Sequence, residues 1–229
     1  MHAVQADRPD LGMPPRGRAA ATLSFRPARP EDADACAPLI FASGVREFGF
    51  FLGEPAATCI DFLAFAFGSK QGRFSYRRHR VAVDGNARVV AVLAVHDGRR
   101  TWLDDPHVAL MLLLFFGVRR TVRMLLRGLT LESELPAPKS SQTLIAHCAT
   151  HEQLRGTGLF SGLFADALHA GSLERDGGRQ VVLDVLVSNT RAYGLYRRLG
   201  FIELPRRAPA SPRLPRELES VRMQFVGRG

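Results

Sequence analysis

Residues 151–160, HEQLRGTGLF, place an arginine and two glycines between a run that reads as a strand and a run that reads as a helix. Glycine adopts positive φ without strain and lets the backbone approach a ligand closely. The free N–H groups and the dipole at the start of a helix attract anions, and Arg155 adds a charge-assisted donor. The spacing of Arg155, Gly156 and Gly158 therefore predicts a phosphate-binding turn.

A tight strand–helix turn without any ligand explains the same residues. No Gly-Lys-Ser/Thr follows, so the stretch is not a Walker A loop, and the third glycine of the dinucleotide fingerprint is missing. A short glycine motif is weak evidence by itself, and other residues must decide between the two interpretations.

The elements that must position this turn alternate between strands and helices along the chain. Residues 84–86, Asp-Gly-Asn, lie between two β-branched runs and predict a hairpin. Asn189 is a favourable N-cap, and Gly200 is a favourable residue to end a helix. Strands are expected at 23–29, 79–98 (a hairpin), 142–150, 180–188, 201–205 and 219–225, and helices at 31–44, 57–68, 105–129 with a break at Gly117, 159–178 and 189–200. This interleaved order predicts an α/β fold.

Composition limits the classes of protein that need to be considered. The 229 residues suffice for one sizeable core and are few for two. The formal net charge of +9, nearly all of it from arginine, is compatible with an anionic partner, and a bias in genomic base composition explains it equally well. Cys36, Cys59 and Cys148 are far apart and odd in number, so neither a disulfide framework nor a thiolate zinc site is indicated.

The N-terminal stretch and the apolar runs bear on where the protein works. Residues 1–21, rich in Pro, Gly, Arg and Ala, are expected to form a flexible tail. They contain no apolar core of signal-peptide length. The longest apolar run, Val108–Val118, is too short to span a bilayer. We therefore expect a cytoplasmic protein without a membrane partner.

A second motif follows the buried strand at 180–188. Its residues stand at fixed spacing and are Asn189, Ala192, Leu195, Tyr196, Leu199, Gly200 and Phe201. Together with Gln153, Gly156 and Gly158 this pattern resembles the GNAT superfamily of acetyl-CoA-dependent N-acetyltransferases, and the resemblance covers about residues 22–226.

The resemblance implies a GNAT fold within one domain, residues 22–229. That fold has a central, mixed, mostly antiparallel twisted sheet of six to seven strands flanked by helices. Here it would carry a helical insertion at about residues 101–140, before the fourth strand.

The resemblance also implies acetyl-CoA as cosubstrate and no metal. In the family, the strand before the glycine turn separates from its neighbour at a bulge, and the pantetheine arm bonds to its backbone. Asn189 matches a residue that contacts this arm. Its role as a helix N-cap is the alternative explanation. The implied cofactor-binding residues are Cys148, Ala149, Thr150, Gln153, Arg155, Gly156, Thr157, Gly158, Leu159, Phe160 and Asn189.

Two catalytic roles follow from the match. Tyr196 matches the family residue that protonates the leaving CoA thiolate, which suits a phenol acting on a thiolate of lower conjugate pKa; a tyrosine packed in the core is the alternative. Many family members use a glutamate base on the strand at 142–150, and this strand has none. His147 is its only titratable group of suitable pKa. Glu152, Asp184 or a chain of water molecules are other candidates for the base, and His147 is otherwise an ordinary sheet histidine.

These residues predict transfer of an acetyl group to a primary amine by direct attack, with a small molecule or a peptide as acceptor. A non-catalytic module that senses acyl-CoA is the alternative. No nucleic-acid partner is expected, because no known binding signature occurs. Homodimers are common in the family, and the sequence marks no interface. Arg119, Arg120, Arg123 and Arg127 recur in the insertion, which predicts either a solvated basic face or a lid over the acceptor site.

Overall fold

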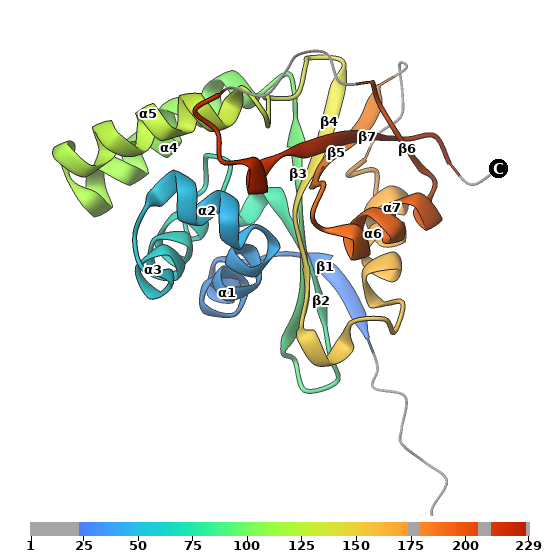
Figure 1. The fold of residues 1–229 in the computed structure, drawn as a ribbon. Helices are drawn as coiled ribbons and strands as arrows, with labels where there is room; N and C mark the ends of the chain where they lie inside the picture. Colours follow the sequence, from blue (N-terminus) through green and yellow to red (C-terminus); the bar gives the residue numbers. More distant parts are fainter. Residues whose placement is uncertain (1–22, 174–178, 206–211, 228–229) are drawn as a thin grey trace, which may run out of the picture.

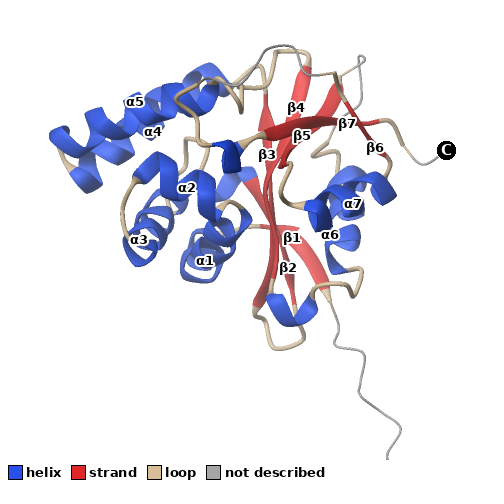
Figure 2. Cartoon of the chain, in the orientation of Figure 1, coloured by secondary structure: helices blue, strands red, loops and turns tan. Residues whose placement is uncertain are grey.

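The computed structural model describes residues 23–173, 179–205 and 212–227. The expected tail at 1–21 lies outside these residues. One seven-stranded sheet runs through the molecule in the order β1-β2-β3-β4-β5-β7-β6, and helices cover both of its faces (Figures 1 and 2). The strands are β1 (Ser24–Pro27), β2 (His79–Val83), β3 (Val89–Asp97), β4 (Gln142–Thr150), β5 (Gln180–Leu186), β6 (Phe201–Glu203) and β7 (Ser220–Phe225).

The sheet is mixed but mostly antiparallel, as expected. Only β4 and β5 pair in parallel, and the other neighbouring strands pair antiparallel. The β2–β3 hairpin forms around residues 84–86, and the buried strand predicted near residue 180 is β5. The predicted α/β fold class is confirmed.

The helices form two layers, one on each face of the sheet (Figure 1). Their bounds are α1 (Ala33–Ser43), α2 (Val45–Leu52), α3 (Ala56–Phe67), α4 (Thr101–Phe116), α5 (Val118–Glu132), α6 (Leu159–His169) and α7 (Thr190–Leu199). The first five cover one face and bury phenylalanines of α2 and α3 against β2 and β3. The last two cover the other face and pack on β3, β4 and β5.

Two predicted helices differ from the structure. The helix expected to end at Gly44 is followed at once by α2, and the two axes differ by 97°. No helix is predicted at residues 45–52, because Gly44 reads as the end of the helix before it. The helix expected at 159–178 ends at His169, because Gly171 has φ 68°, which is strained for other residues. Residues 174–178 of that prediction lie outside the described part.

Strand β4 parts from β5 halfway along its length. Parallel pairing with β5 runs from Gln142 to Ile145. Against β3, Val92 lies opposite Ala149 and Ala94 opposite Ala146, so β4 carries one extra residue there. His147, inside this bulge, has φ 52°, which is unusual for any residue except glycine. The bulge and the separation of the strands are the features expected of a pantetheine-binding strand.

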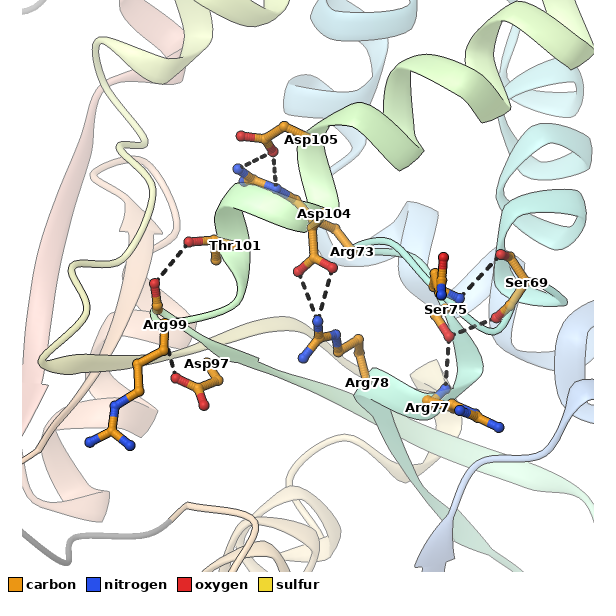
Figure 3. A network of polar contacts seen from close by, with 12 residues as sticks. Ser69, Arg73, Ser75, Arg77, Arg78, Asp97, Arg99, Thr101, Asp104 and Asp105 are labelled. Atoms are coloured by element: carbon orange, nitrogen blue, oxygen red, sulfur yellow. Dashed lines mark hydrogen bonds and ion pairs between the residues drawn. The ribbon is translucent and has the colours of Figure 1, made fainter.

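The insertion between β3 and β4 is a helical hairpin made of α4 and α5, with Gly117 (φ 74°) at the turn. Helix α5 rests on α2, where Arg127 donates from Nε to the carbonyl of Phe51 at 2.9 Å and also donates to the carbonyl of Leu52. Ion pairs hold the base of the hairpin: Arg78 with Asp104, and Arg73 with Asp105 (Figure 3). Among the described residues, no single helix is both long and apolar enough to cross a bilayer, and only the bent pair Pro30–Ser43 and Val45–Leu52 passes that test, by length and composition alone.

Candidate active site

A cavity of about 440 Å³ opens between β4, the glycine turn, the start of α6 and helix α7. Ten of the site residues predicted from the sequence line it. They are Cys148, Ala149, Thr150, Arg155, Gly156, Gly158, Leu159, Phe160, Asn189 and Tyr196. Three others, His147, Gln153 and Thr157, are not part of its wall, although each is a chain neighbour of a residue that is.

The glycine turn presents a row of unused backbone donors. The amides of Leu154 and Arg155 donate hydrogen bonds to the carbonyls of His151 and Glu152, at the 3-10 turn Glu152–Leu154. No described residue accepts a hydrogen bond from the amides of residues 156–161, and α6 has no side-chain cap. These amides lie at the N-terminus of α6, where the helix dipole also favours an anion.

The two glycines give this turn both its shape and its open space. Gly156 has φ 88° and Gly158 has φ 84°, and both conformations are costly for other residues. A Cβ atom built at either position meets no atom within 4 Å, so the space above the turn is empty. The turn is held from below, where the Thr157 hydroxyl donates to the Leu154 carbonyl at 2.8 Å. The turn therefore fits a diphosphate group.

The charged residues of the cavity wall are all arginines. They are Arg155, Arg191 and Arg198. Arg155 donates from Nε to the Thr150 carbonyl at 3.3 Å and lies 3.9 Å from Glu152, so its side chain is already turned toward the end of β4. A polyanion such as CoA would meet only positive side chains along this wall.

Tyr196 is both a core residue and a cavity residue. Asn189 caps α7 by accepting a hydrogen bond from the Ala192 amide at 3.1 Å, and this fixes the start of the helix that carries the tyrosine. The ring packs edge-on against Phe160 and Phe201. Burial raises the pKa of Tyr196 well above 10, and the neighbouring Cys148 raises it further. The phenol is therefore held in its protonated form.

The Tyr196 side chain is a neighbour of the Cys148 thiol. Burial raises the pKa of that thiol to about 12. The thiol in turn lies 3.6 Å from the Ala146 carbonyl, to which it donates. Cys148 is thus a neutral thiol and not a nucleophile.

His147 lies on the opposite face of β4, against α2 and the other histidines. Its ring stacks on Phe74 and His79, with centroids 5.5 and 5.2 Å away, and lies edge-on to His96. His79 Nδ1 lies 2.8 Å from the Ser75 carbonyl, and His79 Nε2 lies 2.9 Å from His147 Nδ1. A carbonyl oxygen only accepts, so His79 must donate from Nδ1 and accept at Nε2.

It follows that neutral His147 carries its proton on Nδ1 and keeps Nε2 free to accept another. Ser75 is fixed for this task by its own contacts, since its hydroxyl donates to the Ser69 carbonyl at 2.6 Å and accepts from the Arg77 amide (Figure 3). Burial lowers the pKa of His147 well below its ordinary value, with His79 and His96 adding to the effect. His147 is therefore an unprotonated base of fixed tautomer.

The other candidate bases fit the site less well. The Glu152 side chain is 85% exposed and turned toward Arg155. Asp184 is held by Arg222 through two contacts of 2.8 Å, and it is not part of the cavity wall. Both carboxylates are thus either in solvent or already paired.

Sequence reasoning missed several residues of the site. Ala42 and Ser43, at the end of α1, reach the cavity from the other layer, and Arg191 and Arg198 reach it from α7. The spacing of Arg191 and Arg198 around Tyr196 in one helix was a signal that could have been used. The approach of α1 could not be read from any local pattern.

Glu47, on α2, is a second missed carboxylate. Its Oε2 atom is buried and has no hydrogen-bond partner in the described part of the chain. Burial raises its pKa, so it is a stronger base than an ordinary glutamate. Glu47 lies beyond the bend that follows Ser43 of the cavity wall, and its chain neighbour Phe48 packs on His147. Within the described residues, no group of three His, Cys, Asp or Glu side chains could hold a metal ion.

The sequence and the fold were compared with known protein families and solved structures. Residues 124–201 match the model of the acetyltransferase (GNAT) family. An N-acetyltransferase from Staphylococcus aureus Mu50 superposes with a TM-score of 0.65 at 16% identity, covering 88% of this chain and 100% of that one. A comparison with curated protein sequences finds no match.

Two further solved structures are similar. A structure described as an acetyltransferase gives a TM-score of 0.61 at 18% identity, covering 88% of this chain and 98% of that one. A structure described as histone acetyltransferase HPA2 and related acetyltransferase, from Corynebacterium glutamicum ATCC 13032, gives 0.56 at 20% identity, covering 90% and 97%. These likenesses show the fold, and the family match covers both the glycine turn and α7. Residues 124–201 thus match the acetyltransferase (GNAT) family, and the described chain has the fold of these acetyltransferase structures.

Proposed function

We propose that the protein transfers an acetyl group from acetyl-CoA to a primary amine, which attacks the thioester directly. One observation carries the proposal: the free amides of residues 156–161 and the protonated hydroxyl of Tyr196 belong to the same cavity. The first can hold a diphosphate, and the second can supply a proton to a leaving thiolate.

The residues of the glycine turn and the three arginines of the wall would hold the phosphates of acetyl-CoA. The unpaired part of β4, residues 146–150, offers backbone groups to the pantetheine arm, because β5 no longer pairs with it there. When bound, acetyl-CoA supplies an acyl carbon open to attack and a thiolate that can leave. Of these strand residues, Cys148 to Thr150 line the cavity and could contact the arm.

Tyr196 holds the proton that the leaving thiolate needs. Tyr196 lines the same cavity wall as the residues at the end of β4 that would hold the thioester. Its raised pKa keeps it protonated at every pH at which an amine acceptor can react. This supports the role of general acid.

His147 and Glu47 are the two candidates for the base. A primary amine is mostly protonated near neutral pH, so a group of the protein or a water molecule must accept its proton before or during attack. His147 has a free Nε2 atom on the face of β4 that meets α2. Glu47 has a buried, unpaired oxygen on α2. Glu47 neighbours Phe48, which packs on His147, so both candidates belong to the side of β4 that meets α2.

A panel of primary amines with acetyl-CoA, read by release of free thiol, tests the proposal. The panel contains amino acids, peptide N-termini, polyamines and aminoglycosides. The proposal expects thiol release that depends on one class of amine and is lost in Tyr196→Phe. Binding of acetyl-CoA with no turnover on any amine would instead favour a module that senses acyl-CoA. No binding at all would reject both functions.

A further inference from the structure

The hairpin of α4 and α5 exposes an apolar face that no part of the described chain covers. On α5 this face carries five large apolar side chains, and on α4 it carries three. They are Val118, Val122, Leu125, Leu126 and Leu129, and Leu110, Leu113 and Leu114. We call this set the hairpin face. Side chains at this spacing on a helix normally pack on a partner.

The hairpin face is not the face that holds the hairpin to the protein. Thr121 and Met124 of α5 and Leu112 of α4 are buried against the body. Arg127 fastens the buried side by donating to carbonyls at the end of α2. The hairpin is therefore anchored on one side, and its other side remains apolar and open to solvent.

The most exposed apolar side chains gather near the turn. Leu114 is 63% exposed and Val118 is 69% exposed, and Gly117 stands between them. Figure 1 shows this turn at the end of the hairpin that lies farthest from the sheet. Leu113 adjoins it, so an apolar tip is presented at the edge of the molecule.

The charge around this tip has one sign. Residues 106–131 contain four arginines and no aspartate or glutamate. Arg127 is bound to α2, and Arg120 lies 3.7 Å from Glu54. Arg119 and Arg123 are exposed, and no described residue forms an ion pair with either of them. They follow the tip by less than two helical turns, along the border of the hairpin face.

We propose that the hairpin face docks on an anionic lipid surface, with the tip in the interface and Arg119 and Arg123 among the headgroups. An amphipathic element with leucine and valine on one side and arginine beside them is suited to such a surface. A second copy of this chain is a poorer partner. Its hairpin would offer apolar contact but no carboxylate between residues 106 and 131, and it would bring like charges together.

Co-sedimentation of the full chain with lipid vesicles tests this. One set of vesicles contains equal parts of phosphatidylcholine and phosphatidylglycerol, and the other contains phosphatidylcholine alone. The proposal expects binding to the anionic vesicles that weakens as salt is added. Leu114→Ser with Val118→Ser should weaken it by about tenfold or more, since both side chains leave the interface. Arg119→Gln with Arg123→Gln should weaken it by about 30-fold.

Matched controls separate the site from general effects of charge or apolarity. Ile202→Ser with Val226→Ser removes two comparably exposed apolar side chains elsewhere, and Arg88→Gln with Arg99→Gln removes two exposed charges elsewhere. Both should leave vesicle binding unchanged. All four positions of the test variants are exposed, so thermal unfolding should confirm that the variants are folded.

Two results would overturn the proposal. One is binding to the anionic vesicles that does not exceed the binding to phosphatidylcholine, or that survives both test variants. The other is a dimer, measured by light scattering without lipid, that Leu114→Ser with Val118→Ser converts to a monomer. In that case the hairpin face belongs to a second copy of the chain.

Discussion

The Nε2 atom of His79 lies 2.9 Å from the Nδ1 atom of His147, and this hydrogen bond decides which nitrogen of His147 is free. His79 can only accept there, because its own proton is on Nδ1 and is donated to the Ser75 carbonyl. The two rings come from β2 and β4, which are not neighbours in the sheet. The free Nε2 of His147 therefore depends on a residue 68 positions earlier in the sequence.

If His147 is the base, His147→Gln should lower kcat by about 100-fold while the Kd for acetyl-CoA stays unchanged. Replacing His79 by asparagine should give a smaller loss, because the tautomer of His147 would no longer be fixed. In the double variant, the His79 substitution should add little to the loss in kcat caused by His147→Gln, because both substitutions act through the Nε2 atom of His147. Steady-state kinetics over a range of acceptor concentrations measures these effects, and His169→Asn on α6 serves as a control.

Glu47→Gln distinguishes the competing base. If Glu47 takes the proton, this change should give the larger loss in kcat, again about 100-fold, and His147→Gln should be nearly silent. Full activity in both variants would show that neither side chain is needed and that water accepts the proton.

Tyr196→Phe should lower kcat by about 100-fold or more and leave acetyl-CoA affinity intact, because the ring packing is kept and only the proton donor is lost. Tyr193 on the same helix provides a matched control, since its hydroxyl donates to Glu203 at 3.0 Å and lies outside the cavity wall. Tyr193→Phe should therefore be nearly as active as the wild type. Equal losses in the two variants would contradict the assignment of Tyr196 as the acid.

Gly156→Ala and Gly158→Ala should each weaken acetyl-CoA binding and cost about 1–2 kcal/mol of folding stability, because alanine is strained at their positive φ. Gly171 tests whether strain alone explains the loss of binding. It also has positive φ and open space around it, but it lies beyond the other end of α6. Gly171→Ala should lose a similar amount of stability in thermal unfolding and bind acetyl-CoA normally.

Folding stability should fall as the pH drops from about 6.5 to about 4. Burial lowers the pKa of His79 to about 4, and it lowers the pKa of His96 and His147 as well, with Arg73 and Arg78 acting in the same direction on His96. The unfolded chain binds protons below pH 6.5, and the native chain resists them, so each such histidine removes about 1.4 kcal/mol per pH unit in this window. Above pH 6.5 these groups should contribute no slope.

Denaturant unfolding at a series of pH values measures this slope, and the difference between wild type and His79→Asn isolates one histidine. In the variant, the slope of unfolding free energy against pH between 6.5 and 4 should be smaller by the contribution of one histidine, about 1.4 kcal/mol per pH unit. An unchanged slope would mean that His79 is protonated in the native state.

Sequence patterns predicted those parts of the fold that local chemistry controls. The Asp-Gly-Asn turn, the Asn189 cap and the two glycines before α6 each follow from the conformational preferences of single residues. The strand β5 was clear from its apolar run. Helix α2 was not predicted, because Gly44 reads as the end of the helix before it.

The candidate site was predictable only on the cofactor side. Ten predicted residues line the cavity. They belong to two short motifs, one around the glycine turn and one around α7, and each motif can be recognised from local sequence. The histidine cluster is assembled from β2, β3 and β4 beside α2, and its members are separated by long stretches of chain. No spacing rule could bring His79 and His147 together, because their contact depends on the bulge in β4. Glu47 was missed for the same reason, since only the bend between α1 and α2 buries it.

The central claim is that the backbone amides of residues 156–161 bind the diphosphate of acetyl-CoA, and calorimetric titration of the full chain with acetyl-CoA tests it most directly. The account predicts one binding event per chain, with an affinity that falls in Gly156→Ala and Gly158→Ala and is kept in Gly171→Ala. A titration without heat, together with an unfolding temperature that saturating acetyl-CoA leaves unchanged, would contradict it.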